Sequence, residues 1–135
     1  MKDDLVLIRV KQPGLIAALV RFILRTFSKG GEYGHVAILS PEDHLVYCFN
    51  IKGARAQRLD LYLAEGNEIL PTSYKVEYTQ GMKKIADTIK NKYNVLFNIK
   101  LFLPSINVRG DNCVSWCCRV LGREELGHKE PDFFQ

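Results

Sequence analysis

The chain has 135 residues, of which 47% are apolar and 25% are charged, and its net charge is +4. This length predicts a single domain over residues 1–135 that buries roughly two-thirds of its unfolded surface. The composition is ordinary for a globular protein. The small positive charge favours an anionic partner or surface without identifying one, and we expect no nucleic-acid partner.

The four cysteines do not have the spacing of a disulfide framework. Three of them crowd one short segment, and two of these are neighbours, for which a bridge would be strained. The first residues, Met1 to Leu5, include two acids and lack the basic and apolar regions of a signal peptide. We therefore expect free thiols, no signal peptide, and a cytoplasmic or otherwise reducing compartment. The cysteines are Cys48, Cys113, Cys117 and Cys118.

The N-terminal third predicts a strand followed by a helix. Asp4 to Val10 is a nearly continuous run of β-prone residues, and Gln12-Pro13-Gly14 ends it. Leu15 to Phe27 reads as a helix, but it is too short to span a bilayer and contains two arginines. We expect no transmembrane segment, and we favour packing on a sheet over peripheral contact with a membrane.

A β-hairpin is predicted next, after a loop at Ser28–Glu32. Its strands are Gly34–Leu39 and Leu45–Phe49, joined by a polar turn. If Leu39 pairs with Leu45, His35 and Tyr47 point to one side of the sheet and Cys48 points to the other. A shift of one residue would reverse this arrangement.

The rest of the chain predicts short alternating elements. The expected strands are Ala54–Leu59 and Ser73–Tyr78, and Leu59–Leu63 is expected to form a turn of helix. Residues 82–93 have the spacing of an amphipathic helix, and Leu101 to Ile106 is an apolar stretch. The last element is a helix over Asp111–Gly122.

Cys113 stands out among the cysteines because of its place at the start of this last helix. Asp111 and Asn112 are both favoured N-cap residues, and Gly122 suits the other end. Free amide groups and the helix dipole in a first turn lower a thiol pKa and can hold an oxyanion. Cys117 and Cys118 lie a turn deeper among apolar residues, so we expect them to pack in the core.

Each candidate residue also has a purely structural interpretation. Cys113 and His35 could both be packing residues, and Trp116 could be buried rather than lining a groove. A zinc site is disfavoured because only one pair of cysteines has a suitable spacing. We expect His44 to be solvated in its turn and His128 to lie on the surface.

The order of these elements resembles that of the circularly permuted NlpC-type papain-like hydrolases. The matching parts are the first strand, the Gly34-His35-Val36-Ala37 strand and its hairpin partner, Lys92-Tyr93-Asn94, and the Asn-Cys-x-x-Trp helix at 112–116. This group includes the YiiX-like proteins and the lecithin:retinol acyltransferase-like enzymes, in which the histidine strand precedes the cysteine helix. The resemblance covers roughly residues 4–122. It implies an α+β, papain-like fold with a central antiparallel sheet packed against a few helices.

The resemblance also implies roles for individual residues. Cys113 would be the nucleophile and His35 the general base. The position of the third, orienting residue is occupied by Tyr47, where YiiX-like members tend to have glutamate and the acyltransferase-like members have a second histidine. Tyr47 can accept a hydrogen bond from the imidazole, but it is neutral. Asn50 is the second candidate for this role.

Three functions remain open at this point. The first is a cysteine hydrolase of the peptidase or amidase type, which acts on an amide or ester bond of a peptide or cell-wall peptide. The second is a thiol acyltransferase or phospholipase acting on acyl lipids, and the third is an inactive binding module with the same fold. For all three, we expect no cofactor and no metal ion.

Overall fold

The computed structural model describes residues 2–14, 35–50, 53–89, 113–127, 129 and 133–135. Within this part of the chain, five strands form one antiparallel sheet in the order β4-β3-β2-β1-β5. The sheet packs against a few helices, which confirms the predicted α+β class. The strands are β1 (Leu5–Lys11), β2 (His35–Ser40), β3 (Leu45–Asn50), β4 (Gly53–Arg58) and β5 (Glu68–Val76), and the helices are α2 (Leu59–Ala64), α3 (Tyr78–Thr88), α5 (Cys113–Leu121) and the short 3₁₀ helix η1 (Glu124–Leu126).

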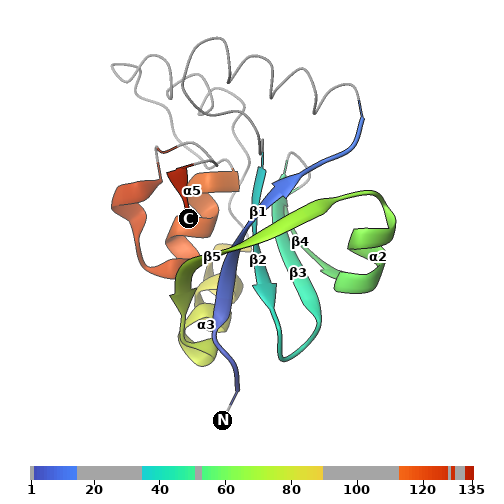
Figure 1. Cartoon of the computed structure of the whole chain (residues 1–135). Coiled ribbons are helices and arrows are strands. Elements are labelled where there is room, and N and C mark those ends of the chain that lie inside the picture. Colours follow the sequence, from blue (N-terminus) through green and yellow to red (C-terminus); the bar gives the residue numbers. More distant parts are fainter. Residues whose placement is uncertain (1, 15–34, 51–52, 90–112, 128, 130–132) are drawn as a thin grey trace.

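Helices cover both faces of the sheet. Figure 1 shows α3 and α5 on one face, here called the α5 face, and α2 on the other, here called the α2 face. Because both faces of β1 are covered, its first four residues, Leu5 to Ile8, are all apolar and do not alternate with polar residues. The α5 face buries Leu5, Leu7, Val36, Ile38, Phe49, Val114, Trp116 and Cys117 among others, and the α2 face buries Ile8, Val10, Ala37, Val46, Cys48 and Tyr62.

The β2–β3 hairpin is confirmed, but its predicted register is wrong by one residue. Leu39 pairs with Val46 rather than Leu45, and Tyr47 therefore pairs with Ile38. The four residues from 41 to 44 form the turn, so Ser40 and Leu45 are the first paired residues. Since successive side chains alternate between faces, this shift moves every side chain of β3 to the face opposite the predicted one.

The helix α5 confirms the element predicted around Cys113. It begins at Cys113, and Gly122 follows its end with φ +72°. The amide groups of Gly122 and Arg123 donate to the carbonyls of Arg119 and Cys118 over 3.1 and 2.8 Å, which is the Schellman pattern of a helix end. Trp116 is fully buried and stacks on Phe49, with ring centroids 5.5 Å apart. It therefore packs in the core instead of lining a groove.

Two elements begin earlier than predicted. β5 starts at Glu68 and passes through Pro71, which an edge strand tolerates because one side of its backbone has no strand partner. α3 starts at Tyr78, where the Glu77 carboxylate accepts from the amide of Gln80 over 2.8 Å. The strand at β4 and the turn of helix at α2 are confirmed.

Several predictions concern parts of the chain that the structure does not describe. These are the helix at 15–27, the loop at 28–32, the Lys92-Tyr93-Asn94 motif, the apolar stretch at 101–106, and the capping residues Asp111 and Asn112. Among the helices that are described, none has the length and apolar character needed to cross a membrane.

Candidate active site

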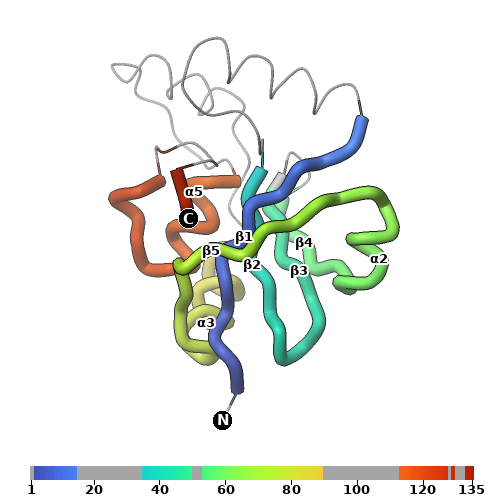
Figure 2. Tube along the Cα trace, viewed as in Figure 1, coloured from blue at the N-terminus to red at the C-terminus, as the bar shows by residue number. Residues whose placement is uncertain are grey.

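Cys113 occupies the first position of α5, beside the start of β2. Figure 2 shows the beginning of α5, the beginning of β2 and the end of β1 together at one end of the sheet, the upper end in that view. The Cys113 side chain is half-buried there, and its sulfur accepts from the backbone amide of Val36. The structure therefore brings the predicted nucleophile to the strand that carries the predicted base.

The pairing of β2 explains why an amide at Val36 is free to meet the sulfur. Within the described strands, β2 pairs with β3 only from Ile38 to Ser40, whereas β3 pairs with β4 as far as Asn50. The first residues of β2 thus have a strand partner only on the β1 side. Because a buried amide requires a hydrogen-bond partner, the thiol at the tip of α5 takes the place that a β3 carbonyl would occupy.

Two opposing effects act on the Cys113 thiol. The amides of Val36, Val114 and Cys113 itself face the sulfur and lower its pKa. Burial has the larger effect, and the net pKa is raised above the ordinary value for a thiol. In the resting state the proton therefore stays on the sulfur, and the three amides form a cluster of donors that can stabilise a negative charge formed nearby.

His35 is the first residue of β2 and is buried, with 6% of its surface exposed. It pairs with Val10, whose side chain lies on the α2 face, so the imidazole points to that face as well. Burial lowers the pKa of His35 to about 4, and the ring is neutral at physiological pH. Its Nε2 atom is buried and has no hydrogen-bond partner among the described residues.

Cys113 and His35 are close along the backbone even though the imidazole turns toward the α2 face. The sulfur meets the amide nitrogen of Val36, which is bonded to the carbonyl carbon of His35. Standard bond lengths then place the sulfur within roughly 6–7 Å of the His35 Cα atom. Rotation of the His35 side chain about χ1 can therefore move its ring toward or away from the Cys113 sulfur without a change in the backbone.

The two candidates for the third residue have different outcomes. Tyr47 pairs with Ile38 and packs against the α5 face, so it lies on the side of the sheet opposite His35. The structure thus corrects the expectation that Tyr47 and His35 are diagonal neighbours on one face. The Asn50 backbone pairs with Gly53, but its side chain lies outside the described part of the structure.

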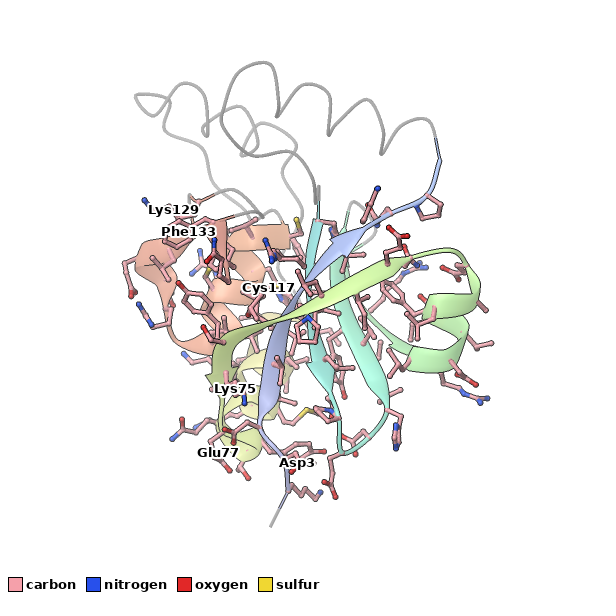
Figure 3. The ribbon with its side chains drawn as sticks, viewed as in Figure 1. Asp3, Lys75, Glu77, Cys117, Lys129 and Phe133 are labelled. Carbon is pink, nitrogen blue, oxygen red and sulfur yellow. The ribbon has the colours of Figure 1, made fainter. Side chains whose placement is uncertain are left out.

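The other cysteines and histidines mostly lie where the sequence places them. Cys117, labelled in Figure 3, and Cys118 are fully buried in the α5-face core, as predicted, and all four thiols are free. His44 is exposed in the turn, whereas His128 lies outside the described residues. Cys48 is buried on the α2 face, the same face as His35, which reverses the predicted arrangement.

One further polar residue lies on the α2 face, and no pattern in the sequence marks it. Tyr62 of α2 is 4% exposed, and its hydroxyl donates a hydrogen bond to the Cys48 thiol. The hydroxyl lies beside the Cys48 thiol, whose proximity contributes to raising the Tyr62 pKa after burial itself. A tyrosine within an apolar turn of helix has no sequence signal that separates it from a packing residue.

Comparison with known proteins finds no match for this chain. No protein-family model matches the chain, and neither does any curated protein or any solved structure. In the part of the chain that is described, no three metal-ligating side chains gather at one place. The geometry of Cys113 and His35 is therefore the basis for a functional proposal.

Proposed function

We propose that the protein is a cysteine hydrolase in which Cys113 attacks an amide or ester bond and His35 acts as the general base. The observation that supports this most is the contact between the Cys113 sulfur and the amide that follows His35. It joins a thiol at a helix start, a group of amide donors and an imidazole within one short stretch of structure. The proposal includes a permuted papain-like fold, supported by a histidine strand that precedes the cysteine helix.

The chemistry uses groups that the site already contains. The sulfur forms a bond to the substrate carbonyl carbon while the imidazole of His35 takes the thiol proton. The carbonyl oxygen becomes an oxyanion, which the amides of Cys113 and Val114 can stabilise. The imidazolium then protonates the leaving amine or alcohol, and a water molecule hydrolyses the thioester with His35 again accepting a proton.

The resting pKa values place a condition on this mechanism. Burial favours the neutral forms of both the thiol and the imidazole, so the proton transfer is unfavourable while the two groups are apart. Direct contact between them would stabilise the thiolate and the imidazolium together. We therefore propose that the ion pair forms only when the His35 ring turns toward the sulfur, as substrate binds.

Substrate class is part of the proposal. We favour a peptide-like or cell-wall peptide substrate, and hydrolysis or transfer of the acyl chain of a lipid is the alternative. Both begin with the same thioester on Cys113, so the two differ in the acyl donor and not in the first chemical step.

Hydrolysis of p-nitrophenyl acetate tests the activity, because this ester is small and needs little substrate recognition. We expect wild-type turnover, loss of turnover in Cys113→Ser, and a loss of about 10²–10⁴-fold in His35→Gln. Cys118→Ala is the matched control, since it removes a buried thiol from the same helix. Equal rates in all four proteins would refute the proposal. Fatty-acid release from phosphatidylcholine vesicles by wild type would select the lipid alternative.

An inactive binding module is the second candidate, and one observation favours it. The His35 ring points to the α2 face, and burial holds its pKa at about 4, which suits a structural histidine. In that case no thioester forms on Cys113 with any acyl donor. Its half-buried thiol would then line a binding surface without reacting.

A further inference from the structure

β5 is an edge strand, because β1 is its only strand partner in the described part of the sheet. The pairing of the two strands shifts opposite Leu7, where the residues from Thr72 to Tyr74 form a β-bulge. The Thr72 hydroxyl donates to the Leu7 carbonyl over 2.7 Å, in place of a backbone amide. The Ser73 amide is therefore free to point away from β1, toward the outer edge of the sheet.

The last described residues of the chain dock at this bulge. The Ser73 amide donates to the Gln135 carbonyl over 2.8 Å. Phe134 is fully buried, and its ring meets the Tyr74 ring edge-on with centroids 5.3 Å apart. A peptide that adds to a sheet edge makes the same two kinds of contact, a backbone hydrogen bond and a side chain in a neighbouring pocket. The outer edge of β5 thus already binds peptide backbone within this protein.

A groove lies beside this contact, between β5 and the end of α5. Its volume is about 410 Å³, which is within the range of ligand-binding pockets. Leu121 is 7% exposed and gives the groove an apolar wall, whereas Lys75 is exposed at its rim. The described residues that line it are Ser73, Tyr74, Lys75, Leu121 and Arg123.

The charges of this lining favour an anionic ligand. The described lining includes a lysine and an arginine but no acid, and Figure 3 labels the lysine, Lys75, on β5. The guanidinium carbon of Arg123 lies 6.0 Å from the centroid of the Tyr74 ring, which places this cation at the wall of the groove. Glu125 accepts from Nε of Arg123 over 2.6 Å. A guanidinium has further N–H donors on its terminal nitrogens, which can bind a second carboxylate.

The backbone of Lys75 can pair with an added strand. The amides of alternate residues in a strand point to the same side, and Lys75 lies two positions beyond Ser73. The Tyr74 amide between them turns inward, to the Thr72 hydroxyl at 3.2 Å. The amide and the carbonyl of Lys75 therefore face the outer edge, as the Ser73 amide does.

We propose that this groove binds an extended acidic peptide segment of a partner protein, which adds to the outer edge of β5 at Lys75. The peptide backbone pairs with the amide and carbonyl of Lys75, and a glutamate or aspartate side chain lies between Lys75 and Arg123. An apolar peptide residue packs on Leu121 and Tyr74. The site is at the end of α5 opposite Cys113, so it does not depend on the function proposed for that thiol.

Titration of the ¹⁵N-labelled full chain with a capped peptide of alternating glutamate and valine tests the proposal. We expect the amide signals of Lys75 and Arg123 to shift, and exchange of the Lys75 amide with solvent to slow. The Ser73 amide should exchange slowly even before peptide is added, because it is bonded to Gln135. Absence of binding would overturn the proposal, as would shifts confined to β4, the other edge strand.

Charge variants locate the binding. Lys75→Gln and Arg123→Gln should each weaken binding about twofold to fivefold, the effect of losing one exposed charge pair. Arg55→Gln is the matched control, since it removes the same charge from an exposed position of β4 at the opposite edge of the sheet, and it should leave the affinity unchanged. An equal loss of affinity in all three variants would indicate general attraction of an acidic peptide to a basic protein, and would overturn the site.

Two further ligands test the mode of binding. The same peptide methylated at every backbone amide cannot donate to the Lys75 carbonyl, so we expect it to bind about fivefold more weakly or less tightly still. An unchanged affinity of the methylated peptide would overturn strand addition. Inorganic phosphate carries the charge without the backbone, and shifts as large as those from the peptide at the same concentration would assign a small-anion site instead and overturn the proposal.

Discussion

The sulfur of Cys113 accepts a hydrogen bond from the amide of Val36, the residue that follows His35 in β2. This single contact joins the start of α5 to the start of the histidine strand. It depends on the first residues of β2 having no strand partner on the β3 side within the described part of the sheet. The site therefore lies where the start of β2 has no β3 partner and the first residue of α5 bonds to its backbone instead.

Alkylation with iodoacetamide should show a thiol that is accessible but not ionised at rest. Because burial raises the Cys113 pKa, we expect the midpoint of its pH–rate curve to lie above the usual thiol range near pH 8.5. Peptide mapping by mass spectrometry measures this for each cysteine. Cys117 and Cys118 serve as internal controls and should react only after unfolding. A Cys113 midpoint near pH 6 would instead indicate an ion pair already formed at rest.

The stability of the protein should depend on the titration of His35. Its pKa is lowered from 6.5 to about 4 in the folded state, so the unfolded chain binds more protons between these values. Its contribution to stability is complete above pH 6.5 and is lost as the pH falls toward 4, by up to about 3 kcal/mol. Urea unfolding at a series of pH values measures this loss. His35→Gln should flatten the curve in this window, and an equally steep curve in the variant would assign the loss to other groups.

Tyr47 should be dispensable for the chemistry of the site. The hairpin register places it on the α5 face, away from the imidazole of His35. We expect Tyr47→Phe to change the rate of p-nitrophenyl acetate hydrolysis by less than about twofold, because substitutions away from a site have small effects. A loss as large as that of His35→Gln would mean that Tyr47 reaches His35 in the active state.

Gly81 in α3 should be required for close packing and not for flexibility. A Cβ atom at this position would lie 2.8 Å from Cγ1 of Val76 and would also collide with the side chain of Leu5. Gly81→Ala should therefore lower the free energy of unfolding by about 1–3 kcal/mol, although alanine is the better helix former. Ala86→Gly, at an exposed position of the same helix, is the control and should cost about 1 kcal/mol by propensity. An increase in stability for Gly81→Ala would contradict the packing argument.

The sequence predicts well which segments form strands and helices, but it predicts poorly the register in which β2 and β3 pair. The strand at β1, the hairpin, and the helix α5 (Cys113–Leu121) follow from apolar periodicity and capping residues, which act locally. The register of β2 against β3 depends on how the turn at 41–44 closes, and a one-residue difference reverses the faces of Tyr47 and Cys48. The burial of Tyr62 beside Cys48 could not be predicted, because it depends on how α2 packs over the sheet.

The most direct test of the central claim is the mass of Cys113 after a brief reaction with p-nitrophenyl acetate, quenched in acid. A nucleophile activated by His35 predicts an acetyl group on Cys113 within the first turnover, and about 10²–10⁴-fold slower acetylation in His35→Gln. Acetylation of Cys113 at the same rate in the two proteins would contradict the account. So would an unmodified Cys113 in wild type while the ester is consumed.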